Sequence, residues 1–300
     1  MDDFGSRLHQ AICATKTVLC VGVDPHPSLM PEIFGGSSHR PTDAGAIAAL
    51  ENFCDAVLEA VVGRIPAIKP QVAFFEAYGP EGLAVLKRLS AQARAEGLLV
   101  IMDAKRGDIG STATAYAEAW LGADSVFGSD ALTINPYLGL DSLTPFITSA
   151  QKSGAGLFIL VRTSNAGSAD IQQQISDGQP VWQHVAQLLA DNVTAAQTAG
   201  SPLSPIGVVM GATGPDEAGM LRAELPSAPF LIPGYGAQGA SAADACSGLF
   251  RDENGQVTGG IVNASRGITH TESARSAVNI AEYKRLVSEN ITRAISELAL

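Results

Sequence analysis

The sequence predicts a (β/α)8 barrel, the TIM-barrel α/β fold, and three observations carry this prediction. Short apolar runs alternate with longer amphipathic segments along the chain. There are eight such runs, which favours a closed barrel over an open sheet. Charged and polar residues collect where the runs end, and the C-terminal ends of barrel strands are where such folds place their chemistry.

The eight runs are nearly continuous in apolar residues and rich in β-branched side chains. This composition is typical of parallel strands that are covered on both faces. The runs span residues 15–24, 65–69, 98–104, 129–135, 155–161, 205–212, 228–233 and 259–265.

Amphipathic segments separate the runs and predict helices. They span residues 44–62, 81–97, 111–122 and 180–197, and the chain closes on one long predicted helix at 273–300. Three Gly-, Ser- and Asp-rich stretches, near 34–43, 164–180 and 247–258, are predicted to be loop insertions. No linker divides the chain, so we expect residues 1–300 to form a single domain.

The charge balance restricts the partners. With 19 basic and 30 acidic residues among 300, the net charge is −11, which disfavours binding to nucleic acid or an anionic membrane. No apolar run approaches the ~20 residues of a membrane span, and the N-terminus lacks a signal-peptide pattern. We therefore expect a cytoplasmic protein.

Cysteine and histidine spacing predicts no metal site. The four cysteines form no CxxC pair and no Cys/His ligand spacing, and the five histidines are scattered. The cysteines are expected to be small core residues in a reducing compartment.

Charged residues at three strand ends form the strongest functional signal. Asp103 and Lys105 lie two apart on a predicted strand, so their side chains should point to the same side, the barrel mouth. Lys69 ends the second run and Asp24 the first. A structural ion pair would explain Asp103 and Lys105 alone, but not this convergence. Opposite charges keep the lysines protonated, and a protonated lysine can deliver a proton to a carbanion.

The segment "GYGAQG" at 234–239 matches a dinucleotide-binding pattern, but its context differs. It follows the seventh strand rather than opening a Rossmann domain, and no acidic residue ends a following strand about 20 residues later. In a barrel, the loops after strands seven and eight are the usual phosphate site. Gln238 as a donor and Arg266 as a fork-shaped cation suit that ligand.

Several motifs resemble the orotidine 5′-phosphate decarboxylase family. "DAKRGDIGSTA" at 103–113 matches its D-x-K-x-x-D signature, including a threonine four residues after the last aspartate. "GVDP", "IKPQ", "PGYGAQG" and "NASRGI" follow in the right order at strands one, two, seven and eight. "LTINPYLGLDSLTPF" at 132–146 resembles the longer bacterial subgroup. The resemblance covers nearly the whole chain.

The resemblance implies cofactor-free, metal-free decarboxylation of orotidine 5′-monophosphate to uridine 5′-monophosphate, the last step of de novo UMP synthesis. Lys105 is similar to the lysine that protonates C6 of the pyrimidine. Asp103 matches the carboxylate against the substrate's carboxylate, and Lys69 the lysine linking the array to the ribose. Asp108, with Thr112 beside it, matches an aspartate that reaches into the active site of the other subunit, which implies a homodimer.

The remaining roles implied by the resemblance concern binding. Asp24 resembles the ligand of the ribose hydroxyls, and Ser164 the serine that hydrogen-bonds the pyrimidine edge. Gln238 and Arg266 resemble the phosphate-binding pair.

Other functions stay open from the residues alone. A metal-dependent sugar-acid phosphate decarboxylase of the same superfamily would use Mg²⁺. A Schiff-base aldolase could use Lys69 or Lys105, and a barrel could bind a nucleotide without catalysis. Asn135 and Arg162 also lie at strand ends, with no assigned role.

Overall fold

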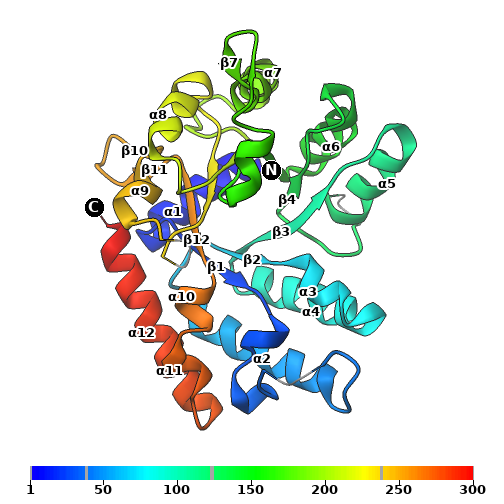
Figure 1. Ribbon diagram of the computed structural model, residues 1–300, viewed down its shortest axis with the longest axis vertical. Coiled ribbons are helices and arrows are strands. Elements are labelled where there is room, and N and C mark those ends of the chain that lie inside the picture. The colour runs from blue at the N-terminus through cyan, green and yellow to red at the C-terminus, as the bar shows by residue number, and fades with distance from the viewer. Residues whose placement is uncertain (1, 38–39, 122–124, 237–238, 300) are drawn as a thin grey trace.

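Eight parallel strands close into a barrel in the computed structural model, which describes residues 2–37, 40–121, 125–236 and 239–299. Around the barrel the order is β1-β12-β9-β8-β5-β4-β3-β2 (Figure 1). The strands are β1 (Leu19–Val23), β2 (Ala67–Pro70), β3 (Leu99–Arg106), β4 (Ala131–Ile134), β5 (Gly156–Arg162), β8 (Ile206–Met210), β9 (Phe230–Pro233) and β12 (Gly260–Ala264). Each overlaps one predicted run, which confirms the fold class.

Helices surround the barrel (Figure 1). Four match predicted segments: α2 (Ala46–Val61), α4 (Gly79–Ala95), α5 (Gly110–Leu121) and α7 (Val181–Ala196). Two more, α6 (Leu140–Ser153) and α8 (Pro215–Glu224), help complete the outer layer. The short elements at the strand ends are η1 (Pro27–Leu29), η2 (Glu32–Phe34), α3 (Val72–Glu76), α9 (Ala242–Cys246) and α10 (Arg266–Thr269).

The prediction of one helix over 273–300 is wrong. The structure has a short α11 (Glu272–Arg275) and a separate α12 (Ile280–Leu298). The predicted helix is interrupted at Asn279, because its side chain accepts a hydrogen bond from the Glu282 amide and caps the N-terminus of α12. Asparagine side chains compete with the helical backbone in this way and favour the cap position.

Two of the three predicted loop insertions contain small hairpins. The first, near 164–180, folds into η3 (Ala166–Asp170) and a hairpin of β6 (Ile175–Ser176) with β7 (Gln179–Pro180). The second, near 247–258, contains β10 (Phe250–Arg251) paired with β11 (Val257–Thr258). The third, near 34–43, includes residues 38–39, which lie outside the described part of the chain.

Helix α1 (Phe4–Thr15) lies against the N-terminal ends of the strands. Phe4 packs edge-to-face on Phe158, with ring centroids 5.8 Å apart. A Cβ at Gly156, the first residue of β5, would lie 2.1 Å from the Phe4 ring. The absence of that side chain lets α1 close this end of the barrel, opposite the strand ends that carry the charged residues.

No helix within the described ranges has both the length and the apolar character that a membrane crossing requires.

Candidate active site

A buried carboxylate held by two lysines lies at the C-terminal end of the barrel. Asp103 Oδ2 is 2.6 Å from Lys69 Nζ, and Asp103 Oδ1 is 2.6 Å from Lys105 Nζ. The side chains of Lys69 and Asp103 are only 5% and 10% exposed, whereas that of Lys105 is 47% exposed. These three residues, here called the charged array, therefore join a buried ion pair to an ammonium group that reaches the solvent side.

Two neutral side chains complete the contacts of the Asp103 carboxylate. Gln71 donates its Nε2 to Oδ2 at 3.1 Å, and the Thr133 hydroxyl donates to Oδ1 at 3.0 Å. The same Thr133 oxygen accepts the backbone N–H of Lys105 at 2.9 Å. Strands β2, β3 and β4 thus fix one carboxylate through four donors.

The charged array keeps its charges despite burial. Burial alone would raise the pKa of Asp103, but the ammonium groups of Lys69 and Lys105 outweigh it and hold that pKa well below its usual range. Burial alone would lower the pKa of Lys69, but Asp103 and Asp24 outweigh it and hold that pKa above its usual range. Asp103 and Lys69 are therefore both charged at neutral pH.

The backbone of β3 is irregular where it presents Lys105. The pairing register with β4 shifts between Met102 and Arg106, and Lys105 has a φ of 47°. A non-glycine residue in this left-handed region is uncommon, and inside a strand it marks local strain of the kind that active sites often contain. The side chains of Asp103 and Lys105 do meet, as the two-residue spacing predicts, but a bulge rather than a regular strand brings them together.

A cavity of about 490 Å³ opens above the charged array. It is mostly walled by residues from strand ends and the loops that follow them. Its lining residues are Asp24, Lys69, Gln71, Asp103, Lys105, Thr133, Leu160, Thr163, Ser164, Asn165, Gln172, Val209, Leu231, Pro233, Gly234, Tyr235, Asn263, Ser265 and Arg266.

Two buried oxygens in this cavity have no hydrogen-bond partner among the described residues. They are Oδ1 of Asp24, after β1, and Oδ1 of Asn263, on β12. Such acceptors are costly to leave unpaired and suit a ligand with hydroxyl or N–H donors. Asn263 was missed by the sequence analysis; its signal is its position, next to last in the final strand.

Arg266 lines the cavity beside the loop after β9. It is the first residue of α10 and is exposed, and its guanidinium makes no hydrogen bond to the described residues. Gly234 lines the same wall with a φ of 109°, which only glycine adopts without strain. The predicted partner Gln238 lies outside the described residues.

The first insertion forms another wall and holds Ser164 at the cavity. Gln172 accepts the Thr163 N–H and donates to the Thr163 hydroxyl, both at 2.8 Å. Arg162 donates to the Ser168 hydroxyl at 2.7 Å, which gives this strand-end residue a bracing role. A Cβ at Gly211 would lie 2.8 Å from the Ser164 backbone, so this glycine permits the close approach.

Asp108 and Thr112 do not enter this cavity. Asp108 is half-buried, and its carboxylate accepts the Ile109 N–H at 2.8 Å. Thr112 is exposed on the first turns of α5. Asn135, a strand-end residue to which the sequence assigned no role, uses its Oδ1 to accept the Tyr137 N–H and shapes the next loop.

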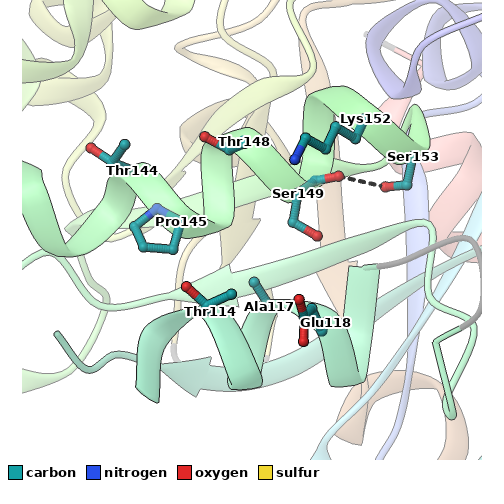
Figure 2. Close-up of a pocket in the computed structure, with 9 residues that line it drawn as sticks. All are labelled: Thr114, Ala117, Glu118, Thr144, Pro145, Thr148, Ser149, Lys152 and Ser153. Atoms are coloured by element: carbon teal, nitrogen blue, oxygen red, sulfur yellow. Dashed lines mark hydrogen bonds between the residues drawn. The ribbon is translucent and has the colours of Figure 1, made fainter. Parts of the chain in front are cut away.

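A second hollow of similar volume lies between α5 and α6 (Figure 2). Its lining is mainly small and hydroxyl-bearing, with one acid, Glu118, and one base, Lys152. It lies on the outer helices and holds no array of converging charges. The cavity at the strand ends is therefore the candidate active site.

Comparisons with known proteins show which proteins this chain resembles. A family model described as "Orotidine 5′-phosphate decarboxylase / HUMPS family" matches residues 17–280. A curated orotidine 5′-phosphate decarboxylase of Rhodopirellula baltica is 42% identical, over 89% of this chain and 88% of the relative. The one from Streptomyces coelicolor is 44% identical, over 89% and 90%.

A solved structure with the same printed family name is also similar to this chain. A crystal structure described as an orotidine 5′-phosphate decarboxylase of Streptomyces avermitilis superposes with a TM-score of 0.78 at 38% identity. The match covers 100% of this chain and 97% of the other.

Proposed function

The chain belongs to the orotidine 5′-phosphate decarboxylase / HUMPS family, and we propose that its charged array removes CO2 from orotidine 5′-monophosphate to give uridine 5′-monophosphate. The family description joins two groups, and the curated relatives at 42–44% identity carry the decarboxylase name. The observation that carries the proposal is the Asp103 carboxylate, which two lysines hold at 2.6 Å each beside an open cavity.

The reaction needs a leaving carboxylate and a proton for the carbon left behind. The C6–carboxyl bond breaks, CO2 departs, and the bonding electron pair stays on C6 as a carbanion. The ammonium of Lys105 gives a proton to C6, and the resulting amine takes a proton back from water. No cofactor enters this scheme, because the protein's own charges stabilise the carbanion.

Electrostatics supplies the driving force. A substrate carboxylate 4 Å from Asp103 would be repelled by about 4 kcal/mol at an effective dielectric of 20. That repulsion disappears as CO2 leaves, while the attraction between Lys105 and the growing charge on C6 increases. Enzymes near the upper end of known accelerations lower their barriers by roughly 20 kcal/mol, so this contact must act together with substrate binding.

Groups far from C6 supply that binding energy. Arg266, Gln238 and the glycine loop at Gly234 take the phosphate in this proposal. The unpaired oxygen of Asp24 accepts a ribose hydroxyl, next to Lys69. Ser164 contacts the pyrimidine edge. Binding energy at remote groups can offset the repulsion at the reacting carboxylate.

The alternatives fit less well. In a Schiff-base aldolase the nucleophile is a neutral amine, but Asp103 and Asp24 outweigh burial and raise the pKa of Lys69 above its usual range. Lys105 is ion-paired with the same carboxylate. The curated relatives do not favour the metal-dependent sugar-acid phosphate decarboxylase.

We also propose a homodimer in which Asp108 completes the partner's active site. Asp108 is outside its own cavity, and apolar side chains next to it in the fold are exposed. Ile109 is 59% exposed, Tyr137 79% and Leu138 50%. These residues follow β3 and β4 at the mouth of the barrel, where a second copy would cover them and bring Asp108 into reach.

Two further proposals concern the whole chain. The chain works as one barrel domain, with a single continuous core of buried apolar residues in support. It works in the cytoplasm, and its four cysteines, all free thiols, suit a reducing compartment.

The direct test follows the absorbance of orotidine 5′-monophosphate with purified protein in EDTA, with uridine 5′-monophosphate and CO2 quantified. We expect equal amounts of both products and no loss of rate on adding EDTA. A folded protein that leaves the substrate intact, or that needs a divalent metal, would contradict the proposal.

A further inference from the structure

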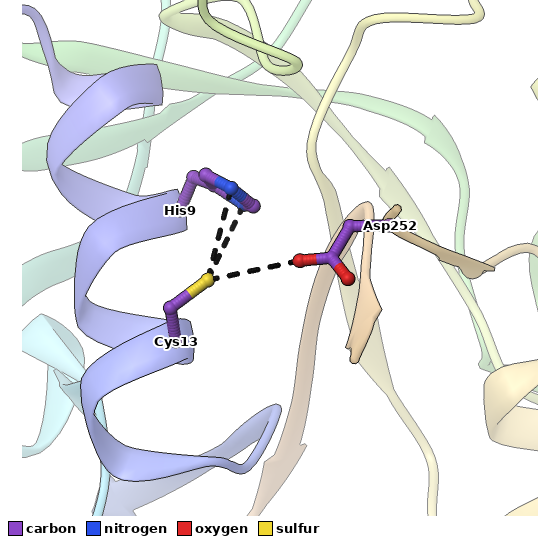
Figure 3. Close-up of side chains that lie close together, drawn as sticks. All are labelled: His9, Cys13 and Asp252. Carbon is purple, nitrogen blue, oxygen red and sulfur yellow. Dashed lines mark hydrogen bonds between the residues drawn. The ribbon is translucent and has the colours of Figure 1, made fainter. Parts of the chain in front are cut away.

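A histidine, a cysteine and an aspartate meet at the end of the barrel opposite the active site (Figure 3). His9 and Cys13 lie four residues apart on α1, so they share one face of the helix. Asp252 reaches them from the turn of the β10–β11 hairpin. The expectation that no cysteine and histidine share a ligand spacing overlooked the helical His9–Cys13 pair.

The ligand atoms of the three side chains lie slightly farther apart than they would around a bound metal ion. Cys13 Sγ is 3.7 Å from His9 Nε2 and 3.9 Å from Asp252 Oδ2, and the three ligand atoms all lie within 4.8 Å of one another. With Zn–S near 2.3 Å and Zn–N or Zn–O near 2.0 Å, a tetrahedral ion keeps such atoms roughly 3.5 Å apart. Shifts of a few tenths of an ångström bring the sulfur to that distance from Nε2 and Oδ2. The His9 ring must also turn about its Cβ–Cγ bond to aim Nε2 at the ion, because Sγ lies nearly as close to Nδ1, at 4.0 Å, as to Nε2.

Neighbouring groups orient two of the ligands. The Thr258 hydroxyl lies 3.2 Å from His9 Nδ1 and can accept its proton, which leaves Nε2 as the nitrogen free to bind a metal. Asp252 Oδ1 accepts the backbone N–H groups of Asn254 and Gln256, both at 2.9 Å, which leaves Oδ2 for Cys13. Such outer hydrogen bonds, which fix tautomer and direction, are typical of metal ligands.

We propose that His9, Cys13 and Asp252 bind a Zn²⁺-type ion, with water as a fourth ligand. A thiolate, an imidazole and a carboxylate together suit a borderline-soft, four-coordinate ion. All three residues are half-buried, so water has access to the remaining position. On binding, the Cys13 proton, which now faces Asp252, is released to solvent.

The ion would be structural and not catalytic. Helix α1 covers the N-terminal ends of the strands, and the hairpin enters β12 at its N-terminal end. The ion would tie the N-terminal helix to the second insertion and thereby give that insertion a purpose. The decarboxylation chemistry lies at the other end of the barrel and does not use it.

Cobalt provides the test, because a thiolate–Co²⁺ bond has its own charge-transfer absorption. Reduced full-length protein, stripped with EDTA and desalted, is titrated with Co²⁺ and then with Zn²⁺. We expect one equivalent of Co²⁺ per chain, a thiolate charge-transfer band, its displacement by Zn²⁺, and a higher melting temperature with Zn²⁺. No band and no uptake would overturn the proposal.

Variants assign the ligands. Cys13→Ser and Asp252→Asn should lose the cobalt spectrum, and Thr258→Val should weaken binding at least tenfold. Cys246→Ser, a half-buried thiol elsewhere, is the matched control and should bind like the wild type. Circular dichroism checks that each variant is folded. Equal uptake by wild type and folded Cys13→Ser, or a loss in Cys246→Ser as large as in Cys13→Ser, would also overturn the proposal.

Discussion

The Asp103 carboxylate is costly to bury, but the groups around it offset that cost. A buried carboxylate loses its hydration, which is tolerated when charges and hydrogen bonds replace the water. Lys69 and Lys105 supply the charges, and Gln71 and Thr133 supply the neutral donors. This arrangement holds a full negative charge where the substrate is expected to bring another.

Replacing Asp103 with Asn should make the free energy of unfolding depend less on pH in the acid range. The pKa of Asp103 is lower in the folded state than the ordinary value of 3.8. Its contribution is therefore complete above that ordinary value and is lost as the pH falls below it. Urea denaturation at several pH values should show the wild-type free energy of unfolding falling more steeply below about pH 4 than that of the variant. Parallel curves would contradict the inferred shift.

Arg266→Ala should weaken substrate binding through the phosphate. Hydrogen bonds to charged groups contribute about 1.5–3 kcal/mol, so KM should rise roughly 10- to 100-fold. Orotidine, which lacks the phosphate, should be turned over equally slowly by both proteins. Arg285→Ala, which removes a surface arginine paired with Glu289, is the control and should keep the wild-type KM. An unchanged KM in Arg266→Ala would remove this residue from the phosphate site.

At the scale of elements, the strand ends and the loops after them set the geometry. The bulge in β3 directs Lys105, and the first insertion closes back on Thr163 through Gln172. Gly211, after β8, lets the segment containing Ser164 lie close to it. The site therefore depends on contacts between loops that follow different strands.

Gly211→Ala should reduce activity while the barrel still folds. The new Cβ would lie 2.8 Å from the backbone N and Cα of Ser164, which forces that segment away. We expect a higher KM and a lower melting temperature. Gly219→Ala is the control, because a Cβ there meets nothing within 4 Å and the residue lies in α8. It should gain about 0.5–1 kcal/mol of stability with wild-type kinetics, and equal kinetics in both variants would contradict the role of Gly211.

The elements that the sequence predicts well have one dominant signal. Continuous apolar runs locate all eight strands, because burial on both faces leaves no other pattern. The break before α12 was missed, since a single capping residue, Asn279, interrupts an otherwise helical pattern. Helix α6 was not predicted and contains Pro145. Local capping and proline effects are small beside the apolar pattern that guided the prediction.

In the candidate site, too, residues with a local sequence signal were predicted and those placed by tertiary contacts were missed. Asp103, Lys105, Lys69, Asp24, Ser164 and Arg266 lie at strand ends and line one cavity. Gln172 was missed, because its approach depends on how an insertion folds back. Asp252 was missed as a ligand partner of Cys13, because 239 positions separate the two in sequence. Tertiary contacts of this kind leave no periodic signal.

At the scale of the molecule, the barrel separates two kinds of site. The C-terminal strand ends hold the charged array, and the N-terminal ends hold α1 and the second hairpin. The mouth also exposes Ile109, Tyr137 and Leu138, the surface on which the proposed dimer depends. Catalysis in this account is therefore a property of two chains.

Mixing two inactive variants tests the dimer. Lys105→Ala and Asp108→Ala should each be nearly inactive as homodimers. If Asp108 acts in the partner's site, hybrid dimers contain one intact site and one site with both defects. An equal mixture, after subunit exchange, should recover about one quarter of the wild-type activity. No recovery in a mixture shown to contain hybrids would place Asp108 in its own subunit's site, and a fully active Asp108→Ala homodimer would place it outside catalysis.

The measurement that tests the central claim most directly is the turnover of orotidine 5′-monophosphate by Lys105→Ala beside the wild type, both in EDTA. Uridine 5′-monophosphate binding to both proteins is measured as the control. We expect fast decarboxylation by the wild type, none detectable by the variant, and product binding retained by both. Near-normal turnover by Lys105→Ala would contradict the role of the charged array as the source of the proton.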